Sequence, residues 1–112
     1  RVKNRDGCTA LGPWLVDAAD VPNPGALKLT TRVNGKTTQQ GTTADMIFDI
    51  PTLIETCSRG ITLLPGDVIA TGTAAGVGMG MKPPRWLQHG DVVRIEIDGL
   101  GTLQNRFVLE GA

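Results

Sequence analysis

The chain has 112 residues, and its eleven basic side chains balance its eleven acidic ones. A length of this order fits one domain, and a chain with no net charge and no basic stripe lacks the field that attracts a nucleic-acid backbone. No apolar run approaches the roughly 18 residues of a membrane-spanning helix, so we expect neither a nucleic acid nor a membrane as a partner.

The start of the chain, Arg-Val-Lys-Asn-Arg-Asp at 1–6, reads like the middle of a domain. We therefore expect the chain to be a piece of a longer protein. There is no signal-peptide pattern, and the two cysteines, Cys8 and Cys57, do not form a CxxC pair. We expect two buried free thiols in a cytoplasmic protein.

The first predicted elements are the two strands of a hairpin. Over residues 27–33, Leu, Leu, Thr and Val alternate with Lys, Thr and Arg, and this period of two is typical of a half-buried strand. Asn34-Gly35 follows at once, and residues 36–40 resume an extended pattern. Asn-Gly between two such runs is a strong hairpin signal.

One short helix is predicted at about 50–59. Ile50, Leu53, Ile54 and Cys57 recur at i, i+3, i+4 and i+7 and so form one apolar stripe. Two to three turns are too few to be stable alone. We therefore expect the stripe to pack on a sheet.

The rest of the chain predicts more β structure. Residues 67–71 are expected to form a short strand, and a glycine-rich loop follows at 72–80. A last hairpin is predicted from residues 93–97 and 103–109, joined by the Asp98-Gly99 turn. The expected fold is mainly β with one short helix, in a single domain.

The loop at 71–78, Thr-Gly-Thr-Ala-Ala-Gly-Val-Gly, is the first candidate for chemistry. Hydroxyl groups and uncovered backbone N–H groups at the end of a strand can form a nest for a carboxylate or another anion. A plain flexible loop explains the same composition equally well. The loop does not complete GxGxxG, because position 81 is Met, so dinucleotide binding is not supported.

Two polar clusters are further candidates. Lys3 beside Asp6 could stabilise negative charge or move a proton, although a surface charge pair is the simpler interpretation. Gln39 belongs to a polar stretch after the first hairpin, at 39–43, which could hydrogen-bond a substrate or cap the next turn. Arg85 is interpreted as a solvated side chain.

Five blocks of the sequence together resemble the fumarylacetoacetate hydrolase (FAH) family. They lie at 11–14, 33–35, 39–48, 64–73 and 90–93, in the order found in that family. The resemblance runs from Lys3 to about Phe107. The Gln-Gln-Gly-Thr-Thr-Ala-Asp stretch at 39–45 and the opening Lys-Asn-Arg-Asp at 3–6 are most similar to bacterial decarboxylases and isomerases of homoprotocatechuate breakdown.

The resemblance implies a fold and a set of site residues. The fold is an FAH-type mixed β-roll or β-sandwich, and residues 1–112 are the C-terminal portion of one catalytic domain. Lys3 matches the catalytic lysine. Thr73 matches the threonine whose hydroxyl and amide contact the substrate carboxylate, Gly72 permits close approach, and Gln39 matches a substrate-binding glutamine.

The resemblance also implies a divalent metal, Mg²⁺ or Mn²⁺, with its ligands upstream of Arg1 and none in this chain. The implied enzyme acts on a small 2-oxo (di)carboxylic acid through a metal-stabilised enolate, by decarboxylation or isomerisation. The reference activities are 5-oxopent-3-ene-1,2,5-tricarboxylate decarboxylase and 2-hydroxyhepta-2,4-diene-1,7-dioate isomerase. A homodimer is implied, and the piece shown is expected to be inactive alone.

Three alternatives stay open. One is an acylpyruvate or fumarylacetoacetate-type C–C hydrolase, because one enolate can serve several reactions. Another is a catalytically inactive β-roll used for oligomer contact. The third is a generic anion-binding module that uses the glycine-rich loop without a metal. The sequence also departs from the family pattern: Gly7 stands where many members have Thr, and Ala74 stands where Pro is common.

Overall fold

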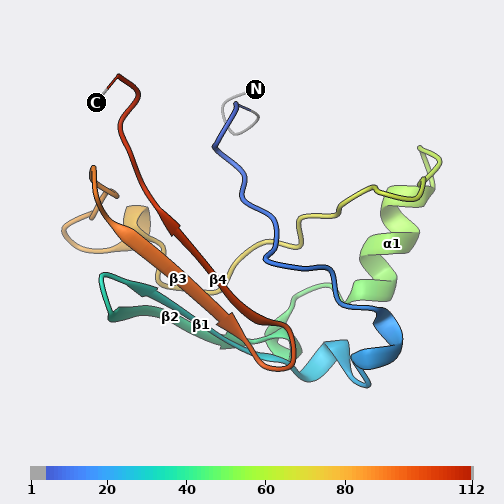
Figure 1. Cartoon of the computed structure of the whole chain (residues 1–112). Coiled ribbons are helices and arrows are strands. Elements are labelled where there is room, and N and C mark those ends of the chain that lie inside the picture. Colours follow the sequence, from blue (N-terminus) through green and yellow to red (C-terminus); the bar gives the residue numbers. More distant parts are fainter. Residues whose placement is uncertain (1–4, 112) are drawn as a thin grey trace.

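Four strands form one antiparallel sheet in the order β2-β1-β3-β4 (Figure 1). The strands are β1 (Lys28–Val33), β2 (Lys36–Thr42), β3 (Val92–Ile97) and β4 (Gly101–Arg106). Both predicted hairpins are therefore confirmed, and β1 joins them by pairing with β3. The structure is a computed structural model and describes residues 5–111.

One face of the sheet, called the inner face here, is defined by the pairing register. Thr31 on β1 lies opposite Gln39 on β2 and Ile95 on β3, and Ile95 lies opposite Leu103 on β4. Because directly opposed residues point to the same side of a sheet, these four side chains share the inner face. Thr31 and Val33, on this face, are two of the three buried residues in the described part of the chain.

A β-bulge shifts the pairing of β1 with β2. Thr31 pairs with Gln39 while Arg32 pairs with Thr37, so Thr38 is the extra residue. The Thr38 hydroxyl donates to the Thr31 carbonyl at 3.2 Å. The bulge determines that Gln39, rather than Gln40, faces the inner side next to Thr31.

The opposite, outer face of the sheet carries charge. Arg32 on β1 lies directly opposite Arg94 on β3, an arrangement that is unfavourable for like charges. Glu96 accepts hydrogen bonds from both arginines, that from Arg94 being 2.6 Å long. The bond from Arg32, more than any other contact, holds the pKa of Glu96 below its usual range. The carboxylate thereby offsets the repulsion between the two guanidinium groups.

A hydrogen-bonded junction connects the turn of the first hairpin to the start of β3. Asn34, with φ 50°, donates from its side-chain amide to Asp91 Oδ1 at 2.6 Å. The Val92 N–H donates to Asn34 Oδ1 at 2.9 Å, and the Gln88 N–H donates to Asp91 Oδ2 at 3.0 Å. Asp91 is 8% exposed. The Gln88 N–H, followed by the Asn34 amide and the Arg85 charge, lowers the pKa of Asp91.

The predicted helix is confirmed as α1 (Ile50–Ser58). Asp49 caps it by accepting a hydrogen bond from the Thr52 N–H at 2.9 Å, and the bonds from Thr52 lower the pKa of Asp49. The expectation that its stripe packs on the sheet is wrong. α1 stands to one side of the strands (Figure 1), and Ile54 is 46% exposed.

The 3₁₀ helices are Ala18–Asp20, Pro24–Ala26, Thr43–Asp45 and Gly78–Gly80.

Two further expectations need correction. Residues 67–71 form no strand, and Val68 within them is 68% exposed; the apolar run has no neighbouring strand to pair with in the described part of the chain. Both cysteines are free, but Cys8 is exposed and Cys57 only half-buried.

Within residues 5–111, no helix has the length and apolar character needed to cross a membrane.

The glycine-rich loop at 72–80 packs directly on β2. A Cβ atom at Gly76, where φ is +107°, would collide with the carbonyl oxygen of Thr38. A Cβ at Gly41 would lie 2.9 Å from the Cβ of Ala74. The loop is therefore held against the sheet by close backbone contact, and this favours an anchored loop over a plain flexible one.

We predict that Asp91→Asn lowers the melting temperature by several degrees at neutral pH. Both carboxylate oxygens of Asp91 accept hydrogen bonds from N–H donors. In Asp91→Asn one of these oxygens would be replaced by an NH₂ group, which would face an N–H donor and could not accept its hydrogen bond. Since the pKa of Asp91 is lowered in the folded chain, its contribution is present above about pH 3.9 and is lost as the pH falls through the lowered pKa. Thermal unfolding should show the two proteins converging at low pH. Asp98→Asn, at an exposed turn, is the control, and a difference that is constant with pH would contradict the prediction.

We also predict that Gly76→Ala destabilises the fold more than Gly66→Ala. Both glycines have positive φ, +107° and +98°, so both substitutions cost about 1–2 kcal/mol of backbone strain. Only the methyl group added at position 76 meets another part of the chain, since a Cβ at Gly66 has nothing within 4 Å. Thermal unfolding of the two variants measures the difference. Equal losses would show that the loop does not depend on its contact with β2.

Candidate functional site

The structure brings together two of the predicted site residues, Gln39 and Thr73. Gln39 Nε2 donates to Thr73 Oγ1 at 2.8 Å and to the carbonyl oxygen of Ala74 at 2.7 Å. Gln39 comes from the inner face of β2, and Thr73 comes from the loop that Gly76 and Gly41 hold against that strand. The contact between the two residues thus depends on the packing of the loop.

Gly72, the third predicted residue, shapes the backbone just before Thr73. Its φ is +100°, a conformation that L side chains rarely adopt. No atom of the described chain, apart from its immediate neighbours, lies within 4 Å of the place where its Cβ would be. Thr73 is also exposed. The Thr73 backbone and hydroxyl are therefore open to a ligand.

Lys3, the predicted catalytic residue, lies outside the described residues, so its place in the site stays a prediction. Arg5 and Asp6, which follow it, line a groove of about 900 Å³. The groove also contacts Ile95 and Leu103, and both belong to the inner face. The segment after Lys3 and the Thr73 loop therefore share the inner face of the sheet.

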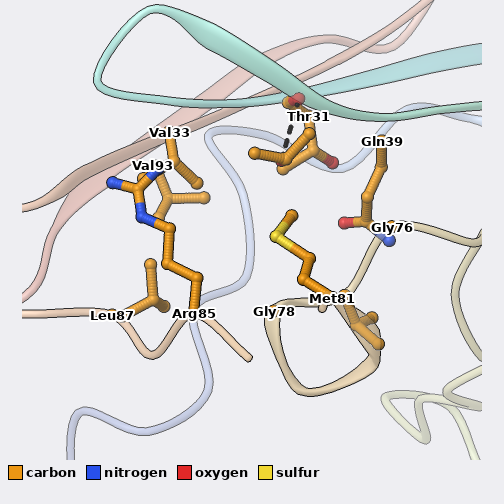
Figure 2. A pocket seen from close by; sticks show the side chains of 11 residues that line it. Thr31, Val33, Gln39, Gly76, Gly78, Met81, Arg85, Leu87 and Val93 are labelled. Carbon is orange, nitrogen blue, oxygen red and sulfur yellow. Dashed lines mark hydrogen bonds between the residues drawn. The ribbon is translucent and has the colours of Figure 1, made fainter. Parts of the chain in front are cut away.

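A smaller cavity of about 250 Å³ lies between β1, β2, β3 and residues 76–87 (Figure 2). Figure 2 shows Met81 and Arg85 extending from this segment toward the sheet, where Val33 and Val93 lie. Gln39 lines the cavity too, with its amide oxygen turned inward and its nitrogen toward Gly76.

This cavity is a poor candidate for the substrate site. It is smaller than the roughly 300–1,000 Å³ usual for small-molecule sites, and neither Thr73 nor Gly72 lines it. Its walls are mostly apolar side chains and backbone, and Arg85 is its one charged lining residue. We therefore place the candidate anion contact at the Thr73 loop.

Arg85 is exposed, as expected of a solvated side chain, and it also lines the cavity. Its backbone N–H donates to the Gly78 carbonyl at 2.9 Å. Sequence reasoning missed the contact between Gln39 and Thr73, which lie 34 residues apart. The spacing carries no signal for their contact; the glycines at 41 and 76 are the only local hint that two segments approach closely there.

The described residues do not form a metal site by themselves. They contain no group of three or more His, Cys, Asp or Glu side chains that could hold a metal ion. The exposed donors at Thr73 are its hydroxyl and its backbone N–H, and N–H and O–H donors suit an anion better than a cation. We therefore assign no chemical step to a metal bound by the described residues.

Known proteins resemble the chain along nearly its whole length. A family model described as fumarylacetoacetate (FAA) hydrolase C-terminal matches residues 1–108. Oxaloacetate tautomerase YisK of Bacillus subtilis (strain 168) is 51% identical over 104 residues, which are 93% of this chain and 35% of that protein. The chain thus spans about a third of the length of the curated relatives it matches.

Solved structures share the fold. A candidate HpcE protein from Mycobacterium smegmatis superposes with a TM-score of 0.89 at 43% identity, covering 94% of this chain and 39% of that one. Maleylpyruvate hydrolase from Sphingobium sp. SYK-6, in complex with manganese(II) and pyruvate, gives 0.78 at 41% identity, covering 87% and 34%.

The named relatives are a tautomerase, a hydrolase and isomerases, so the chain is related to enzymes with several reaction types. The match to the family model, the fold and the ordered sequence blocks agree. The chain belongs to the fumarylacetoacetate hydrolase family.

Proposed function

We propose that this chain is the C-terminal portion of a single FAH-type catalytic domain and supplies the carboxylate-binding part of its active site. The substrate is a small 2-oxo acid, held by the hydroxyl and N–H of Thr73. The observation that carries this proposal is the exposure of Thr73, which follows the positive-φ residue Gly72 and accepts a hydrogen bond from Gln39. A related hydrolase structure that contains pyruvate, itself a 2-oxo acid, supports the substrate class.

The chain's own residues would bind and orient the substrate in this proposal. Fixing the carboxylate sets the direction of the bond that breaks or of the proton that moves. Lys3 would add positive charge close to the reacting oxygen. The enzyme is proposed to depend on Mg²⁺ or Mn²⁺, which would supply Lewis-acid chemistry from ligands outside this chain, upstream of Arg1.

The proposed reaction is decarboxylation or isomerisation of an unsaturated 2-oxo dicarboxylic acid in aromatic-compound breakdown. A second candidate is tautomerisation of oxaloacetate, which is favoured by the relative at 51% identity that carries this name. A homodimer and a cytoplasmic location belong to the same proposal. All of these substrates share a carboxylate next to a carbonyl group, and the Thr73 loop would serve any of them.

The proposal is tested by assaying the full-length protein with oxaloacetate, acylpyruvates and 2-oxo-enedioates. We expect turnover of at least one of them in the presence of Mg²⁺ or Mn²⁺. Treatment with EDTA should abolish it, and either metal should restore it. Turnover that survives metal removal would contradict the metal dependence, and inactivity on every substrate would favour the inactive β-roll.

We predict that Thr73→Val raises KM or lowers turnover by at least tenfold. The substitution keeps the shape of the side chain but removes one hydrogen bond to a charged group, a loss of roughly 1.5–3 kcal/mol. Steady-state kinetics provide the measurement. Thr37→Val is the matched control, because Thr37 is an exposed threonine on the outer face of β2. If Thr73→Val behaved like that control, Thr73 would not belong to the site.

A further inference from the structure

The chemical identity of the contacting atoms fixes the direction of the hydrogen bonds around Gln39. A backbone carbonyl can only accept, so the Gln39 atom 2.7 Å from the Ala74 oxygen must be the NH₂ group. The same nitrogen lies 2.8 Å from Thr73 Oγ1. Since an amide nitrogen does not accept hydrogen bonds, Thr73 Oγ1 is the acceptor in this contact.

The proton of the Thr73 hydroxyl is consequently not used in its contact with Gln39. A hydroxyl group has one O–H donor and two acceptor lone pairs. Gln39 occupies one lone pair, and the described residues show no acceptor for the proton. The hydroxyl therefore has its donor free at an exposed position.

We propose that Gln39 is a positioning residue that reserves the Thr73 hydroxyl proton for the substrate carboxylate. The inference rests on the proposed function, because it takes the Thr73 loop as the carboxylate site. It changes the predicted role of Gln39: both N–H groups of its amide are used inside the protein, so it acts on the substrate through Thr73. Hydrogen bonding to Gln39 also polarises the hydroxyl and makes it a better donor.

The test is a double-mutant cycle in the full-length, metal-loaded protein. Gln39→Met keeps the length of the side chain and removes the N–H donors. We measure KM, kcat and the affinity for oxalate by calorimetry for the wild type, Gln39→Met, Thr73→Val and the double variant. If Gln39 acts through Thr73, its substitution weakens oxalate binding by about tenfold in the wild-type background and by less than about twofold when Val already occupies position 73.

A second variant separates positioning from simple packing. Gln39→Glu keeps the shape but places an acceptor beside the Thr73 hydroxyl, so the proton would turn toward the new carboxylate and away from the substrate. Gln39→Glu should therefore weaken oxalate binding more than Gln39→Met does. Gln40→Met is the matched control, because Gln40 is exposed and lies on the outer face. Thermal unfolding verifies that each variant is folded.

The outcomes are distinct. Equal effects of Gln39→Met in both backgrounds, no effect in the wild-type background, or equal effects of the Met and Glu variants would each overturn the positioning role while the Thr73 site stands. If Thr73→Val alone leaves oxalate binding unchanged, the proposed function fails, and the role of Gln39 fails with it. A coupled loss that is stronger for Glu than for Met supports the inference.

Discussion

The junction between Asn34 and Asp91 is the constraint on which the geometry of this chain depends. It joins the turn after β1 to the first residues of β3, and so fixes which residues of the two strands are opposite each other. With Val33 opposite Val93, the apolar side chains of both strands share the inner face. A shift of one residue would send them to the outer face. The candidate site lies on the inner face, where Gln39 of β2 contacts the Thr73 loop.

Local patterns predicted the local structure well. The alternation at 27–33, the Asn34-Gly35 turn and the apolar spacing around Leu53 correspond to β1, its hairpin and α1. They failed where the outcome depended on a partner elsewhere, as with the packing of α1 and the strand expected at 67–71. The same contrast between local patterns and long-range contacts holds for the candidate site. The resemblance selected Gln39, Gly72 and Thr73, but their contact depends on a bulge and on glycine packing that no local pattern reveals.

In the proposed function this chain binds the substrate carboxylate, and the metal ligands lie outside the chain. This proposal fits the variety of reactions among the relatives. A tautomerase, a hydrolase and isomerases move different bonds, yet substrates with a carboxylate beside a carbonyl can be held in the same way. A loop that grips the carboxylate would not need to change when the reaction does. In that arrangement the residues that distinguish one reaction from another would lie mostly outside the Thr73 loop.

The close approach of Gly41 to Ala74 also protects the pairing of β2 against error. The two glutamines at 39 and 40 are chemically identical, so a slip of one residue along β1 would still offer an amide to the loop. In that slipped arrangement Thr42 would take the position of Gly41, and its side chain would collide with Ala74, because even a methyl group at 41 would lie 2.9 Å from the Ala74 Cβ. Gly41, which takes no part in the proposed binding, thus disfavours a one-residue slip of β2 along β1.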